Sequence, residues 1–320
     1  MGLKEYIFRR TVYALLVVYL VATIVFVLVR SVPGDPVSLM LGGQADEEAR
    51  QALIENLGLD QPMYIQYIEY IGGLLRGDFG QSIITGEPVI QAVIQVAAPT
   101  LSIGMVGIII ATTIAIPLGI VSATRRYQAE DYIATIIAFL GISMPAFWFG
   151  IVLILVFSVQ LDLLPVFGYA PLREEGFATW LSHLILPGIA VALPFGGILM
   201  RMMRSSLLEV MNEDYMRTAR AKGLDDRLVL FKHGLQNALI PVVTVAGILF
   251  GLLLAGIVAV EIVFGYRGLG RLLINSIQRR DFPLVQGSVV VIAFIFVFMN
   301  LLVDLIYPVL DPRIGYGGEQ

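Results

Sequence analysis

The chain has 320 residues, of which 58% are hydrophobic and 14% are charged, and its formal net charge is −4. Soluble domains carry roughly 25% charged residues, so this composition excludes a water-soluble globular protein of this size. Cysteine is absent, which excludes disulfide bonds, thiolate metal ligands and a thiol nucleophile.

The first apolar run extends from Val12 to Val29 and follows the bases Lys4, Arg9 and Arg10. A helix crosses the hydrocarbon layer with about 20 mostly apolar residues, whereas the apolar core of a cleaved signal peptide is shorter. We therefore predict that residues 1–30 form a cytoplasmic N-terminus and a retained first transmembrane helix.

Residues 31–99 are polar to amphipathic and rich in acids, and they contain only Arg50 and Arg76 as bases. Apolar residues recur at helical spacing over Gln44–Leu57 and again over Pro62–Leu75. We predict an extracytoplasmic segment, either a small subdomain or a pair of helices on the outer surface. The apolar side of the second helix is predicted to consist of Tyr64, Tyr67, Ile68 and Ile71.

Further apolar stretches predict membrane spans at approximately 100–123, 132–158, 181–203, 239–263 and 285–308. Prolines lie inside these spans, and proline removes a backbone hydrogen bond that neighbouring helices or water must replace. Helices bent around a central path and ordinary kinked packing explain them equally well. The prolines are Pro117, Pro145, Pro187 and Pro194.

Basic residues favour the cytoplasmic side of a membrane. With the N-terminus inside, the cytoplasm receives the bases of the loop 204–236 and Arg313 of the tail 311–320, and the outside receives the acidic segment. The loop 264–284 is an exception because it places arginines outside. The predicted fold is an all-α integral membrane protein with six transmembrane helices, in which residues 100–310 form the main transmembrane domain.

Few residues could support chemistry by themselves. A Walker A loop requires a glycine directly before its lysine, and no lysine here follows a glycine, so we expect no ATP bound by this route. The histidines His183 and His233 lie far apart, and we expect neither to be catalytic. Glu261 and Asp304 lie near the ends of spans, where an acid is a candidate for the transport pathway.

The loop 204–236 contains the most informative pattern. Asn212 is a candidate N-cap for a short helix, and Gly223 is a candidate terminator because glycine adopts positive φ without a Cβ penalty. Asp225 or Asp226 could cap a second helix in which Leu228, Phe231 and Leu235 share a face. Small residues in the turn would allow another protein to approach the backbone. A solvated basic loop remains an alternative, while a DNA-binding helix-turn-helix is disfavoured by the flanking spans.

Two segments of this loop carry a resemblance to a known family. Residues 215–224 read Tyr-Met-Arg-Thr-Ala-Arg-Ala-Lys-Gly-Leu, and residues 233–241 read His-Gly-Leu-Gln-Asn-Ala-Leu-Ile-Pro. They resemble the cytoplasmic loop of ABC importer permeases, most closely the dipeptide/oligopeptide/nickel group. The wider importer pattern is Glu-Ala-Ala-x3-Gly-x9-Ile-x-Leu-Pro, which Ala219, Gly223 and Leu235 match. The positions that depart from it, as the peptide group also does, are Arg217, Thr218, His233 and Gln236.

Further motifs extend the resemblance over nearly the whole chain, and the long 31–99 segment is typical of the B-type permease of that group. In chain order they are Phe8-Arg9-Arg10, Pro33-Gly34-Asp35-Pro36, Gly77-Asp78-Phe79-Gly80-Gln81-Ser82, Pro145-Ala146-Phe147-Trp148, Glu261-Ile262-Val263-Phe264 with Gly268-Leu269-Gly270, Arg280-Asp281-Phe282-Pro283, and Asp311-Pro312-Arg313.

The resemblance implies a type I ABC importer fold and a non-catalytic subunit in a prokaryotic inner membrane, with both termini in the cytoplasm. It also implies a second permease, an external binding protein for peptides, and two ATPase subunits that bind ATP and Mg. Oligosaccharide, nickel or glutathione import is the alternative within the group, and an ATP-independent channel or carrier is the alternative outside it. The implied coupling interface with an ATPase comprises Tyr215, Arg217, Thr218, Ala219, Arg220, Ala221, Lys222, Gly223, Leu224 and Asp225.

Overall fold

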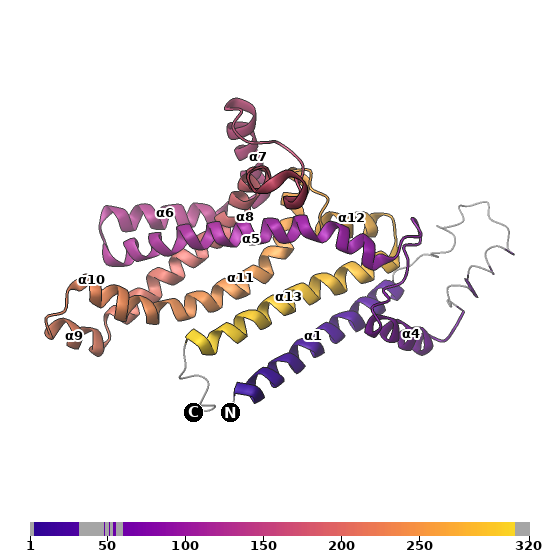
Figure 1. The fold of residues 1–320 in the computed structure, drawn as a ribbon, viewed down its shortest axis with the longest axis horizontal. Helices are drawn as coiled ribbons and strands as arrows, with labels where there is room; N and C mark the ends of the chain where they lie inside the picture. Colours follow the sequence, from indigo (N-terminus) through magenta and orange to yellow (C-terminus); the bar gives the residue numbers. More distant parts are fainter. Residues whose placement is uncertain (1–2, 32–47, 49–50, 52–53, 56–59, 311–320) are drawn as a thin grey trace. The chain divides into compact units, whose positions relative to one another are not determined.

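The computed structural model describes residues 3–31, 48, 51, 54–55 and 60–310. The helix predicted at Gln44–Leu57 and the tail 311–320, with its Asp311-Pro312-Arg313 motif, lie outside these residues. The described part is helical apart from loops and an isolated bridge between Gln81 and Pro88 (Figure 1). Its elements are α1 (Leu3–Ser31), α4 (Met63–Leu75), α5 (Val89–Thr124), α6 (Ala129–Ser143), α7 (Ala146–Leu153), the π-helix η1 (Ile154–Gln160), α8 (Leu172–Met211), α9 (Asp214–Ala221), α10 (Asp226–Leu228), the π-helix η2 (Val229–Gly234), α11 (Leu235–Val263), α12 (Leu269–Gln278) and α13 (Phe282–Leu310).

Among the described residues, five helical stretches are long and apolar enough to cross a membrane. They are Glu5–Ser31, Val89–Thr124, Leu172–Met211, Asp226–Leu253 and Phe282–Leu302. Each contains or overlaps a predicted span. The chain is therefore an all-helical integral membrane protein.

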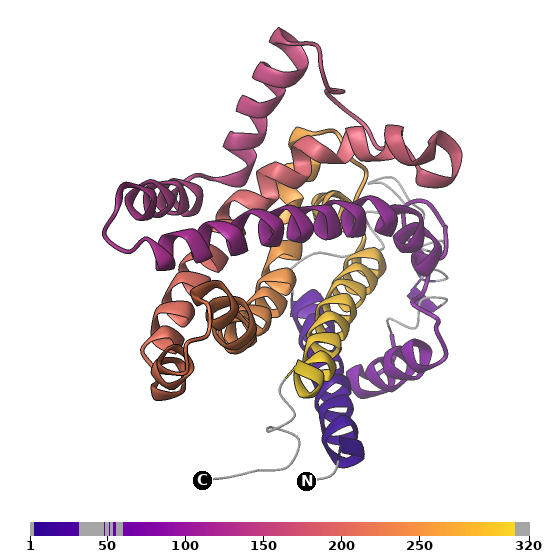
Figure 2. The same cartoon turned by 60° about the vertical axis from the view of Figure 1, so that its left-hand side comes forward.

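The span predicted at 132–158 is a bent pair of helices rather than one helix. The chain bends by 105° between the stretches Ala129–Ser143 and Ala146–Gln160, and Figures 1 and 2 show α7 turned away from α6. Met144 is extended, with φ −88° and ψ 129°, because the ring of Pro145 disfavours the helical region for the residue before it. Pro117 instead lies inside α5, and Pro187 and Pro194 lie in the part of α8 that follows its kink at Gly176.

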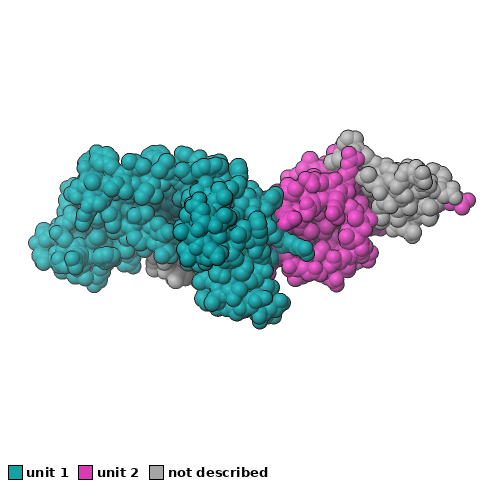
Figure 3. Space-filling model, turned by 90° about the horizontal axis from the view of Figure 1, so that it is seen from above, with its two compact units in different colours: residues 1–11, 99–267, 298–320 teal, residues 12–98, 268–297 magenta. Residues whose placement is uncertain are grey.

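The chain divides into two compact units, shown in different colours in Figure 3. Unit 1 comprises residues 1–11, 99–267 and 298–320, and unit 2 comprises residues 12–98 and 268–297. The core of unit 1 joins parts of α5, α6, α8 and α11 through alanines, leucines and methionines. These small and flexible side chains permit close packing between the helices.

The contact between α6 and α8 depends on glycine in both helices. A Cβ atom at Gly197 of α8 would lie 2.5 Å from the carbonyl oxygen of Ala138, and one at Gly141 of α6 would lie 2.8 Å from that of Leu193. Because both carbonyl oxygens are backbone atoms, rotating a side chain cannot remove the clash with an added Cβ atom. The two glycines therefore set how closely these helices approach.

Unit 2 contains the described part of the predicted extracytoplasmic segment. The helix predicted at Pro62–Leu75 is confirmed as α4, which packs with residues of α1 and α13. Its predicted face is partly wrong, because Tyr64 and Ile68 are exposed. The packed face is instead formed by Tyr67, Tyr70, Ile71 and Leu74.

The loop predicted at 264–284 contains a helix of its own, α12. Leu269 and Ser276 are buried, and Leu272 packs in the same cluster as Leu269, so the inward positions recur at helical spacing. Ten residues are too few for a membrane span, which is why span length alone did not reveal this element.

Candidate functional site

The segment from Asp214 to Leu228, here named the coupling segment, consists of α9, a glycine turn and α10. Gly223 follows the C-cap of α9 with φ +78°, and its N–H bonds to the carbonyl of Arg220. The predicted glycine terminator is therefore confirmed. A Cβ atom at Gly223 would meet no atom within 4 Å, so the turn faces open space.

One buried side chain anchors α9. Met216 is fully buried, and its terminal methyl lies 3.2 Å from the position of a Cβ at Gly234, where Leu207 of α8 also approaches. The hydroxyl of Tyr215 accepts a hydrogen bond from the amide of Asn237 at 3.0 Å. Tyr215 and Met216 therefore attach α9 to α11 and to the π-helix η2.

The opposite side of the coupling segment is exposed. Ala219 is half-buried and the other predicted interface residues are exposed, so the fold gathers all of them on one short, accessible segment. The ion pairs Asp214–Arg217 at 3.6 Å and Arg220–Asp226 at 3.5 Å lie on this surface. Exposed pairs of this kind contribute less than about 1 kcal/mol, so they add little to the support from the buried Met216 and from Tyr215.

The cap predicted at Asn212 is wrong, whereas Asp225, one of the two caps predicted for the second helix, occupies the N-cap position of α10. Asn212 is the C-cap of α8, where its side chain donates to the carbonyl of Leu208, and Glu213 is the N-cap position of α9. The sequence pattern assigned the cap to Asn212 because Glu213 and Asp214 follow it, but α8 continues farther than its apolar stretch. It reaches Met211 because its last two turns pack on other helices of unit 1.

The second predicted helix is the beginning of the fifth membrane stretch. It starts at α10 and passes through the π-helix η2 into α11. Leu228 and Phe231 are exposed while Leu235 packs in the core of unit 1, so the predicted common face is wrong. The wider i→i+5 turns of a π-helix rotate the preceding residues away from the face that α-helical spacing predicts.

The candidate pathway acid Glu261 is fully buried within unit 1. Its carboxylate accepts a hydrogen bond of 2.5 Å from Thr100, and its carbonyl accepts one from the N–H of Tyr266. Burial raises the pKa of the Tyr266 phenol, which stays neutral and donates to the carbonyl of His183 at 2.8 Å. The side chain of Asp304 lies outside the described residues. A pathway role for either acid stays a prediction.

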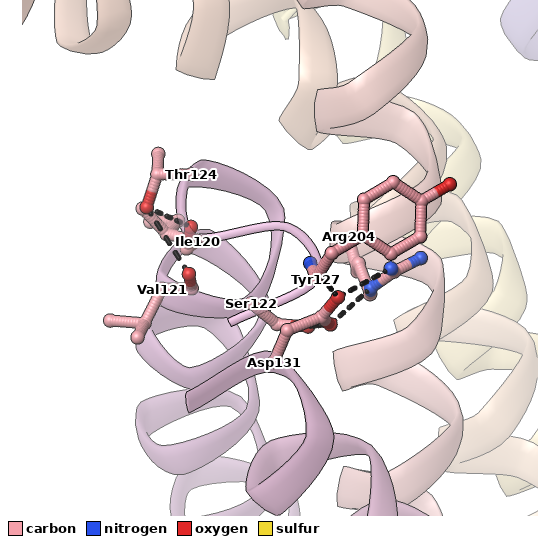
Figure 4. Close-up of polar contacts among 7 residues, drawn as sticks. All are labelled: Ile120, Val121, Ser122, Thr124, Tyr127, Asp131 and Arg204. Atoms are coloured by element: carbon pink, nitrogen blue, oxygen red, sulfur yellow. Dashed lines mark hydrogen bonds and ion pairs between the residues drawn. The ribbon is translucent and has the colours of Figure 1, made fainter. Parts of the chain in front are cut away.

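An ion pair between the buried Asp131 and the partly buried Arg204 was not anticipated from the sequence. The carboxylate of Asp131 in α6 accepts two hydrogen bonds from the guanidinium of Arg204 in α8, at 2.7 Å and 2.9 Å (Figure 4). It also accepts from the hydroxyl of Ser122 at 2.5 Å and the N–H of Tyr127 at 3.0 Å. Both oxygens thus have two partners, which satisfies the carboxylate.

The sequence contained a weak signal for this pair. Asp131 begins the apolar stretch 132–158 and Arg204 ends the stretch 181–203, so both charges lie at the predicted cytoplasmic ends of spans. Interface acids and bases are common there, and the sequence does not reveal that α6 and α8 pack together.

Two of the motifs behind the family resemblance meet in unit 2. Ser82 of the Gly77–Ser82 motif donates to the carboxylate of Asp281 at 2.5 Å, and the N–H of Ile83 donates to the same carboxylate at 3.3 Å. Asp281 belongs to the Arg280–Pro283 motif and is buried before the first turn of α13. A single buried carboxylate therefore connects the two motifs.

Two family models match this chain. The first, described as "Binding-protein-dependent transport system inner membrane component", matches residues 115–316, and an N-terminal model of the same kind of component matches residues 3–104. Among solved structures, a crystal structure of an amino acid ABC transporter with histidines matches at a TM-score of 0.45 and 15% identity, over 70% of this chain and 94% of that one.

Three relatives match over nearly the full length. The oligopeptide transport system permease protein AppB of Bacillus subtilis (strain 168) is 40% identical over 98% of this chain and 100% of its own. The glutathione transport system permease protein GsiC of Escherichia coli (strain K12) is 39% identical over 98% and 99%. The dipeptide transport system permease protein DppB of the same strain is 41% identical over 92% and 94%. The chain therefore belongs to the family of inner membrane components of binding-protein-dependent transport systems.

Proposed function

We propose that this chain is the B-type permease subunit of an ATP-driven importer for di- or oligopeptides. The full-length likeness to permeases named for oligopeptide and dipeptide transport supports this assignment. In this proposal the chain contributes six spans, with the bent pair counted as one, and half of the pathway. A second permease supplies the other half, and the subunit itself catalyses no reaction.

The exposed coupling segment carries the mechanistic part of the proposal. It is short, anchored by one buried methionine, and open on the side that holds the predicted interface residues. A segment of this form can lie in a groove of a separate ATPase subunit without unfolding its own support. ATP-driven closure of the ATPase pair would then displace α9, and with it the inner ends of α8 and α11.

The remaining assignments concern partners and orientation. We place both termini and the coupling segment in the cytoplasm, and we place α4 with its surroundings outside, where an external binding protein delivers the solute. ATP and Mg bind to the partner ATPases. Because the binding protein supplies most of the selectivity, glutathione, oligosaccharides or nickel are alternative cargoes for the same machinery.

Reconstitution tests this function directly. The chain would be co-expressed with its neighbouring permease and ATPase genes, purified, and placed in vesicles with the binding protein and a labelled dipeptide or tetrapeptide. We expect the ATPases to co-purify and uptake to require ATP and the binding protein. Uptake by this chain alone would instead establish a channel or secondary carrier. Uptake of glutathione or a sugar, without uptake of the dipeptide or tetrapeptide, would show that the proposed cargo is wrong.

A further inference from the structure

The inner end of α8 contacts three different parts of unit 1 within a single turn. Arg204 binds Asp131 beside the α5–α6 turn, and the hydroxyl of Ser206 donates to the carbonyl of Ala238 in α11 at 2.9 Å. Leu207 and Met216 of α9 both approach the position that a Cβ atom would take at Gly234. Only Asn212 and Glu213 separate α8 from α9. This turn therefore connects the coupling segment to the rest of the unit.

The Asp131–Arg204 contact has the geometry of a rigid tie. The side chains of Asp131 and Arg204 are 5% and 27% exposed, whereas those of the neighbouring pair Glu130 and Arg125 are 38% and 57% exposed. A two-point contact between guanidinium and carboxylate fixes both distance and orientation, while apolar side chains can slide past one another. The hydroxyl of Ser122 in α5 and the N–H of Tyr127 in the α5–α6 turn donate to the same carboxylate. Through Asp131, α5, this turn and α6 are therefore all attached to α8.

Resting on the proposed function, we propose that Asp131 and Arg204 are positioning residues that make the α5–α6 turn move with the coupling segment. Arg204 lies seven residues before the end of α8, about 10 Å along a helix of 1.5 Å rise per residue. A displacement of α9 by the ATPase therefore reaches Arg204 through one short, straight piece of helix. The ion pair then transmits this displacement to α6, which is the first helix of the bent pair.

The test uses the complete reconstituted transporter and compares peptide uptake with ATP hydrolysis. The variants are Asp131→Asn and Arg204→Gln, and the matched control is Arg125→Gln in the exposed pair on the same turn. We expect Asp131→Asn to assemble and hydrolyse ATP at the wild-type rate, but to import roughly fivefold less peptide per ATP, at the lower end of ordinary coupling factors. We expect the control to keep the wild-type ratio.

Because the chain contains no cysteine, a covalent tie can replace the ionic one. The double variant Asp131→Cys with Arg204→Cys should be poorly coupled when reduced, and a short bifunctional methanethiosulfonate reagent should restore uptake per ATP. Because the cross-link carries no ion pair, restored uptake would show that a mechanical connection between α6 and α8 is the requirement.

Three results would overturn the proposal. An unchanged ratio of uptake to hydrolysis in Asp131→Asn would show that the tie is dispensable. Equal loss of assembly, hydrolysis and uptake would show that the pair only supports folding. Inhibition by the covalent tie would show that the pair must open during the cycle. A wild-type complex that imports nothing in response to ATP would instead overturn the proposed function itself.

Discussion

Gly223 combines a conformational requirement with an open surface. Its φ of +78° favours glycine, asparagine tolerates it, and a β-branched residue does not. No atom lies within 4 Å of its Cβ position, so any steric effect of a side chain must come from a partner. Substitutions there can separate the shape of the turn from docking on an ATPase.

We expect Gly223→Val to lower ATPase binding and ATP-driven uptake, because it both strains the turn and adds bulk. Gly223→Asn keeps the turn and adds a side chain of similar size. If neither variant co-purifies with the ATPase, the ATPase must approach Gly223 too closely for any side chain to fit. If only Gly223→Val fails to co-purify, the requirement is the shape of the turn. Normal binding and uptake by both would contradict docking at this position, and Ala219→Asp supplies an independent test on the same surface.

Asp281 is a second residue whose environment makes a definite prediction. Asp281→Asn replaces one carboxylate oxygen by an NH2 group, which must face either the hydroxyl of Ser82 or the N–H of Ile83, because these two donors bind different oxygens of Asp281. A buried group deprived of its partner costs about 1–3 kcal/mol, so we expect lower thermal stability in detergent. Asp60→Asn, at an exposed position, is the control. Equal melting temperatures for the two variants would show that this contact contributes nothing.

At the scale of helices, the packing of α6 on α8 is set by glycines rather than by large side chains. Gly197→Ala would place a methyl 2.5 Å from the carbonyl oxygen of Ala138. Backbone atoms cannot rotate away, so we expect destabilisation of roughly 1–3 kcal/mol, as for other overpacked cores. Unfolding measured in mixed micelles with increasing SDS would give the value.

Gly256→Ala is the matched control for this helix contact. Gly256 lies in α11, and a Cβ there would meet no atom within 4 Å. Alanine favours helix more than glycine does, so this variant should be neutral or slightly more stable. Destabilisation of both variants to the same extent would show that the α6–α8 contact is not responsible.

At the scale of the whole molecule, the proposed orientation can be read with single cysteines, since the chain has none of its own. We expect Glu5→Cys and Lys222→Cys to react with an impermeant maleimide only after the cytoplasmic side is opened. Asp60→Cys should react from outside in intact cells. The three positions are exposed, so labelling reports the side of the membrane rather than burial. Reaction of Asp60→Cys only from the cytoplasm would reverse the orientation.

The sequence by itself determined the class of protein, the approximate spans and the coupling segment. These follow from properties carried by contiguous residues: about 20 apolar residues for a span, a positive-φ glycine for a helix end, and a local motif for the family. The same local reading placed Pro62–Leu75 in a helix. It failed where a single helix face had to be chosen, as for Tyr64 and Ile68, because alternative stripes at helical spacing are equally apolar.

Only the tertiary structure decided which distant residues meet. Asp131 and Arg204 are 73 positions apart and Ser82 and Asp281 are 199 apart, so no local pattern connects them. The length of α8 and the register shift at η2 likewise depend on packing against neighbouring helices, whereas the bend between α6 and α7 follows locally from Pro145. The coupling segment could therefore be named from its residues, whereas its support and its tie to α6 required the fold, because hydrogen bonds between helices depend on spatial proximity and not on sequence order.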